Sequence, residues 1–173
     1  LVLTMPLVVH AEQFTGTVVG ISDGDTITVL RQGKAVTVHL YGVVCPAGRH
    51  AFGAQARQFT RDVAFQQVVA VLVDSPTSRS RRLIAGVQLP DGRDLSQALV
   101  QAGYAWHDSR YAPADRRLAQ LEAEARAAKR GLWAAGNPTP PWQSRTAQQG
   151  PLLRAQAQHL LRHQETPMAR HGL

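Results

Sequence analysis

Five short runs of apolar and β-branched residues occupy the first half of the chain, and turn residues separate them. Runs of this length that are rich in Val, Thr and Ile predict β-strands. Asp23-Gly24 and the polar stretch 31–34 interrupt the first three runs, which favours three antiparallel strands in a meander. The predicted strands span residues 14–19, 26–30, 36–41, 68–73 and 83–89.

Three other segments repeat apolar residues at the three- and four-residue spacing of a helix. Asp94 lies where the second of these helices needs an N-cap, and Asp115 is expected within the first turn of the third. The predicted helices span residues 51–65, 95–102 and 114–130. Strands followed by separate helices are typical of an α+β domain.

The two ends of the chain differ from this central part. Residues 1–11 are a short apolar run that closes on Val9-His10-Ala11, the pattern of the end of a secretory signal. On this interpretation the mature protein is secreted or periplasmic, and the run is too short to span a membrane. An N-terminal strand is the alternative. We expect a domain over residues 12–145 and a basic tail over residues 146–173 that is flexible or marginally helical.

Composition narrows the classes of protein that fit. The chain has 173 residues with a single cysteine, which excludes an internal disulfide framework and a zinc site built from several cysteines. Its 19 Lys and Arg residues against 12 Asp and Glu residues give a formal net charge of +7. A basic domain favours polyanionic partners such as nucleic acid, although charge says nothing about the fold.

Six local sequences carry a more specific signal because they follow one another in a set order. They are SDGDT at 22–26, HLYGVVCP at 39–46, FGAQA at 52–56, ALVQAGYAW at 98–106, and the segments 121–133 and 137–142. Together they resemble the staphylococcal-nuclease-like, or thermonuclease, family. The resemblance implies a five-stranded OB-fold β-barrel with three helices, which agrees with the elements predicted above.

Enzymes of that family cut DNA and RNA with calcium, two metal-binding aspartates, a glutamate that activates water and two phosphate-binding arginines. The resemblance places Asp25 at the first metal-binding aspartate. His39 stands at the first arginine, Val44 at the second aspartate and Ala47 at the glutamate. A neutral imidazole makes no bidentate fork to phosphate, and calcium requires more than one carboxylate. The expected metal site is therefore incomplete.

A basic run retains the other phosphate-binding position. Arg82 matches the second arginine of the family, with Arg79 and Arg81 close by in the sequence. Such side chains bind phosphate in a salt-dependent and sequence-independent way. Tyr111 is the aromatic residue that we expect to be exposed and to stack on a nucleobase. These four residues are the predicted nucleic-acid-binding set.

The sequence leaves three functions open. The favoured one is a domain of thermonuclease ancestry that binds nucleic acid or another polyanion and has lost or greatly reduced its nuclease activity. The second is an active metal-dependent endonuclease with a rearranged site, in which calcium is the cofactor or His39 or His50 supplies a new base. The third is a protein-interaction module that acts through the basic tail.

Overall fold

The computed structural model describes residues 12–48, 52–73, 82–136 and 138–143. All elements named below lie in the first of two compact units, which ends at Pro138. The predicted signal remnant and the whole of the basic tail lie outside the described residues, as do Arg79, Arg81 and His50.

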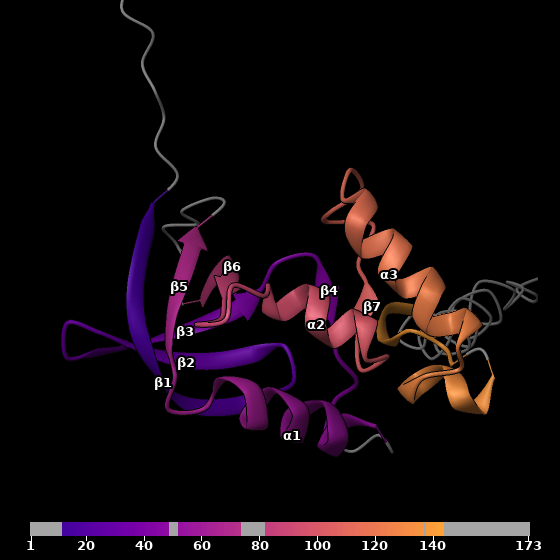
Figure 1. Cartoon of the computed structure of the whole chain (residues 1–173), viewed down its shortest axis with the longest axis horizontal. Coiled ribbons are helices and arrows are strands. Elements are labelled where there is room, and N and C mark those ends of the chain that lie inside the picture. The colour runs from indigo at the N-terminus through magenta and orange to yellow at the C-terminus, as the bar shows by residue number, and fades with distance from the viewer. Residues whose placement is uncertain (1–11, 49–51, 74–81, 137, 144–173) are drawn as a thin grey trace, which may run out of the picture. The chain divides into compact units, whose positions relative to one another are not determined.

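Five strands close into a barrel in the order β1-β2-β3-β6-β5 (Figure 1). Neighbouring strands are antiparallel except for β3 and β6, which run parallel. The prediction of a five-stranded barrel with three helices is confirmed. The strands are β1 (Gln13–Asp23), β2 (Thr26–Arg31), β3 (Lys34–Leu40), β5 (Val68–Val73) and β6 (Arg82–Gln88).

The barrel interior is filled by every second residue of its strands, as the alternation of side chains in a strand requires. Each such side chain contributes roughly 1.5–3 kcal/mol to folding when it leaves water completely. The interior residues with less than 2 % exposure include Val18, Ile27, Val29, Val38, Val69, Val71 and Val87.

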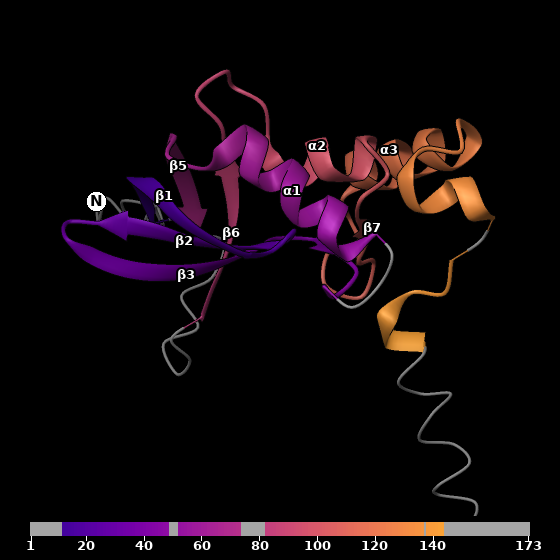
Figure 2. The same cartoon turned by 90° about the horizontal axis from the view of Figure 1, so that it is seen from below.

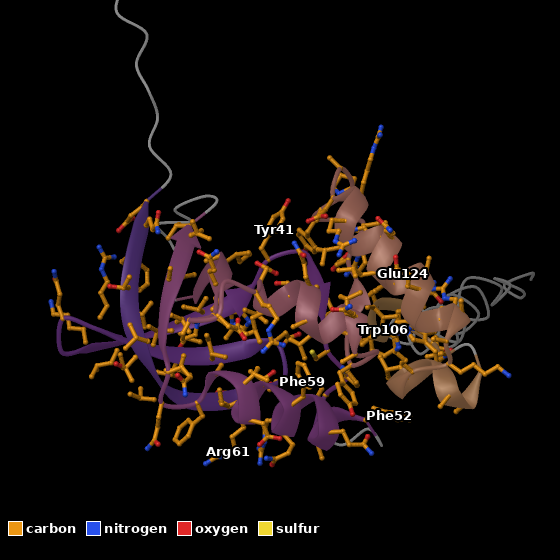
Figure 3. All side chains as sticks on the ribbon, in the orientation of Figure 1. Tyr41, Phe52, Phe59, Arg61, Trp106 and Glu124 are labelled. Atoms are coloured by element: carbon orange, nitrogen blue, oxygen red, sulfur yellow. The ribbon has the colours of Figure 1, made fainter. Side chains whose placement is uncertain are left out.

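Of the three helices, the first two contact barrel strands, and the third packs against the second and lies farther from the barrel (Figure 2). The three helices are α1 (Gly53–Ala64), α2 (Leu95–Gln101) and α3 (Arg116–Ala127). Figure 3 shows Phe59 on the inner side of α1, where its ring lies 5.5 Å from that of Tyr104, and Arg61 on the outer side. No described helix is both long enough and apolar enough to cross a membrane.

The predicted caps explain where the helices begin and end. The carboxylate of Asp94 accepts a hydrogen bond from the N–H of Gln97, which confirms it as the N-cap of α2. Asp115 likewise accepts from the N–H of Leu118, so it is the N-cap of α3 and not a first-turn residue. At the other end Lys129 has a φ of 52°, which an α-helix does not allow. The third helix is therefore shorter than the predicted span 114–130.

A two-stranded sheet outside the barrel was not predicted. It pairs β4 (Val43–Val44) with β7 (Trp106–His107), and a short 3₁₀ helix, η1 (Gly131–Ala135), follows α3. Strands of two residues carry too little alternation for a sequence pattern to reveal them. The small sheet joins the segment after β3 to the segment after α2, and so brings two loops of the candidate site together.

Replacing Gly24 by alanine tests how tightly the turn between β1 and β2 is packed. A β-carbon at Gly24 would lie 2.7 Å from the Cys45 sulfur and 2.8 Å from the Ala56 β-carbon. We expect Gly24→Ala to lower the free energy of unfolding by about 1–3 kcal/mol, as overpacking does. Gly48→Ala is the control, because its β-carbon would meet no atom within 4 Å. Equal urea midpoints for the two variants would contradict the packing described here.

Candidate nucleic-acid and phosphodiester site

The turn that carries Asp25 is buried against α1. The side chain of Thr60 on α1 donates a hydrogen bond of 2.6 Å to the carbonyl of Gly24. The backbone carbonyl of Asp25 accepts from the N–H of Leu40 at 2.9 Å. The turn is thus held by a helix on one side and by the end of β3 on the other, which fixes the direction in which Asp25 points.

Both oxygens of the Asp25 carboxylate are hydrogen-bonded within the protein. Oδ2 accepts from the backbone N–H of Cys45 at 2.8 Å, and Oδ1 accepts from the Thr26 hydroxyl at 3.0 Å. Burial raises the pKa of Asp25, and the nearby charge of Asp23 acts in the same direction. The two hydrogen bonds and the proximity of His39 oppose that rise.

His39 joins the same network through Thr26. The two residues are direct partners across β2 and β3, and Nδ1 of His39 lies 3.1 Å from Oγ1 of Thr26. An ionised carboxylate only accepts hydrogen bonds, so the Thr26 proton points to Asp25. With Asp25 ionised, a neutral His39 donates Nδ1–H to Thr26 and carries the lone pair on Nε2. The structure therefore forms a continuous chain, Asp25–Thr26–His39, with Thr26 only 8 % exposed.

The position of Arg82 adjoins this chain through the barrel. Its backbone begins β6 and pairs with Thr37, while His39 pairs with Ile84 in the same parallel ladder. Position 82 thus lies on the strand next to β3, two residues from the partner of His39. Arg79 and Arg81 fall outside the described residues, so that part of the predicted set is placed by sequence alone.

Tyr111 is 72 % exposed, as expected, and lies on the loop after β7. The guanidinium carbon of Arg110 lies 5.6 Å from the centre of its ring. Asp108 holds that guanidinium with two hydrogen bonds of 2.8 and 2.7 Å, and its own N–H donates to the carbonyl of Gly42. The loop is therefore fixed to the segment that follows β3, which also leads to Cys45.

Similarity to known proteins identifies the family. The family model described as "Staphylococcal nuclease homologue" matches residues 37–135. The chain belongs to this family. An "Uncharacterized endonuclease" of Escherichia coli O157:H7 is 35 % identical over 127 residues, which are 73 % of this chain and 82 % of that protein. A "Micrococcal nuclease" of Shigella flexneri is 37 % identical over 142 residues, or 78 % and 82 % of the two chains. An "Uncharacterized endonuclease" of Haemophilus influenzae is 33 % identical over 146 residues, covering 84 % and 80 %.

The residues at the family's metal-binding positions do not fit a calcium ion. Val44 is half-buried in β4 and Ala47 is exposed, and neither side chain has an oxygen. Calcium takes six to eight oxygen ligands, usually including more than one carboxylate. Within the part of the chain that the structure describes, no three His, Cys, Asp or Glu side chains are placed to hold a metal ion. Neither Val44 nor Ala47 therefore offers a side-chain ligand to a calcium ion.

Two residues of the site were missed by the sequence analysis. Thr26 links Asp25 to His39, and Asp108 fixes Arg110 beside Tyr111. Thr26 could have been found from the predicted hairpin. The four-residue break at 31–34 sets the register of the two strands, and that register pairs Thr26 with His39. No sequence signal distinguishes Asp108 from any surface aspartate, since its importance comes from burial.

Replacing Asp108 by asparagine tests whether the Arg110 contact supports the loop. Hydrogen bonds from Arg110 lower the pKa of Asp108 in the folded state, so its stabilisation is present above the unfolded pKa of about 3.9. It disappears as the pH falls through the folded pKa. We expect Asp108→Asn to cost about 1–3 kcal/mol at pH 7 and much less in acid.

The control for this prediction is Asp91→Asn. Asp91 binds Arg93 at the same two-residue spacing, but both side chains are about half exposed, whereas the Asp108 side chain is 4 % exposed. We expect the control to change thermal stability only slightly because exposed pairs are screened by water. Equal losses for the two variants between pH 3 and 7 would show that burial of Asp108 is unimportant.

Proposed function

We propose that this protein binds nucleic acid through its phosphate backbone and has lost, or greatly reduced, calcium-dependent hydrolysis. One observation carries the proposal: both oxygens of the Asp25 carboxylate are bound by Cys45 and Thr26, and Val44 and Ala47 offer no further ligand. The carboxylate that a calcium-dependent relative would use for metal serves here as a hydrogen-bond acceptor within the protein.

Loss of hydrolysis follows from the chemistry of phosphodiesters. Negative charge builds on the phosphate when water attacks phosphorus, so the site must supply cations and a base. A missing general base typically costs about 10²- to 10⁴-fold in rate, and lost charge stabilisation costs a similar factor. Ala47 stands where the family has the glutamate that activates water, and Val44 stands where it has the second metal-binding aspartate. The two losses together leave little calcium-dependent turnover.

Binding is supported by what the chain retains. Its net charge is +7, and the Arg82 position adjoins the Asp25–Thr26–His39 chain. Arginine binds phosphate bidentately, and Tyr111 offers an exposed ring that is flanked by Arg110. Relatives that are named as nucleases also favour nucleic acid as the ligand. The expectation of a secreted or periplasmic protein rests on residues 1–11 and is part of this proposal.

Salt-dependent binding is the direct test. We expect a fluorescently labelled 30-nucleotide single strand to bind in the presence of chelator, with an affinity that falls as salt rises. Arg82→Ala should weaken binding to unrelated sequences equally and reduce the slope of log K against log salt by about 1. Arg93→Ala is the control, since this exposed arginine lies beyond β6 and pairs with Asp91. Binding that is insensitive to salt and to Arg82→Ala would contradict the proposal.

Restoring the family's residues tests the account of lost hydrolysis. We expect the triple variant His39→Arg, Val44→Asp, Ala47→Glu to cleave DNA with calcium, at least 100-fold faster than the natural chain. The matched control is His39→Arg, Val44→Asn, Ala47→Gln, which has side chains of the same size without the two carboxylates. Rapid calcium-dependent cleavage of DNA by the natural chain would overturn the proposed loss.

A further inference from the structure

The hydrogen-bond chain of the site ends on a histidine nitrogen that the nuclease chemistry of the family does not use. We propose that Nε2 of His39 is a general base toward the 2′-hydroxyl of RNA, and that the protein cleaves RNA without any metal ion. This inference rests on the proposed function, because the RNA must first bind at this site through its phosphates.

The geometry around His39 is that of an oriented base. Thr26 is buried and fixed between the two strands, and its single hydroxyl proton is taken by Asp25. With Asp25 ionised, Nδ1–H of His39 is the donor in the 3.1 Å contact with Thr26. Nε2 is left with its lone pair on a half-buried ring. In many catalytic sites a second group orients the histidine, and a third group holds the second in place. Thr26 and Asp25 have these two positions here.

Asp25 has a matching role in this arrangement. Its carboxylate is anchored by the N–H of Cys45 at 2.8 Å and faces Thr26 with the other oxygen. The hydrogen bond that Asp25 accepts from Thr26 fixes the hydroxyl that faces Nδ1 of His39. Asp25 and Thr26 are thus positioning residues, which would contact neither the RNA nor the reacting atoms.

RNA differs from DNA in carrying its own nucleophile. Hydrolysis of DNA needs an activated water, for which this chain lacks the glutamate and the metal ligands at Ala47 and Val44. The 2′-hydroxyl of RNA is already held next to the phosphorus, so only a base and a phosphate-binding cation are required. His39 is the candidate base, and position 82, whose backbone lies on the neighbouring strand, carries an arginine.

The step balances without a metal ion. Nε2 of His39 takes the 2′-hydroxyl proton, the 2′-oxygen forms a bond to phosphorus, and the bond from phosphorus to the 5′-oxygen breaks. The 5′-oxygen takes a proton from water, and the imidazolium later returns its proton to solvent. The products are a 2′,3′-cyclic phosphate and a free 5′-hydroxyl, and no oxidation or reduction takes place.

The test uses the full chain, a chelator, and a labelled DNA strand that contains one ribonucleotide. Cleavage is expected at that ribonucleotide alone, with a cyclic phosphate identified by mass spectrometry, and the all-DNA strand should remain intact. His39→Gln should slow cleavage about 100-fold or more while the strand still binds. Thr26→Val should slow it roughly tenfold or more, because the imidazole loses the partner that orients it.

Two controls separate catalysis from folding and from contamination. Thr28→Val makes the same change at the next threonine on the same face of β2, which pairs with Thr37 and not with His39. It should leave the rate unchanged. Nitrogen NMR of His39 should show a protonated Nδ1 in the natural chain and in Thr28→Val, and a changed balance of tautomers in Thr26→Val. A purely structural role for Thr26 would leave that balance as it is.

The outcomes distinguish this inference from the function on which it rests. Salt-dependent binding without metal-free cleavage at the ribonucleotide would overturn the inference and leave the proposed function standing. Absence of binding would overturn both. Cleavage that persists in His39→Gln, or that also occurs in the all-DNA strand, would show that His39 is not the base.

Discussion

The buried turn between β1 and β2 is the feature on which the rest of the site depends. Gly24 has no side chain, so the turn can lie against Cys45 and Ala56, and Thr60 binds its carbonyl. The same turn presents the Asp25 backbone to Leu40 and the Asp25 carboxylate to Cys45. The close packing of this one turn therefore connects the barrel to α1 and to the segment after β3.

Burying a carboxylate at this place has an energetic cost, which raises the pKa of Asp25. A backbone N–H and a hydroxyl offset that cost, and the hydroxyl also contacts His39. The buried carboxylate of Asp25 is thus accommodated by the fold, because a hydrogen-bond donor lies within reach of each of its oxygens.

Much of the architecture could be predicted from the chain. The strands of the barrel and the helices follow from apolar alternation and from helical spacing, because each element must bury one side. The cap at Asp94 and the exposure of Tyr111 were also predicted correctly. The pairing of β4 with β7 was not, because two-residue strands form only when distant segments have already been brought together. The limits of α3 were wrong because Asp115 caps that helix from outside.

The sequence by itself determined which chemical groups are present: an aspartate after the turn, a histidine at position 39, and no carboxylate at Val44 or Ala47. Only the tertiary structure decided what those groups do. The β2–β3 register sets Thr26 beside His39, and packing of the turn sets Asp25 beside Cys45. Contacts of this kind join residues 13 and 20 positions apart, and the pairing of β2 with β3 and the packing of the turn bring their atoms within hydrogen-bond distance.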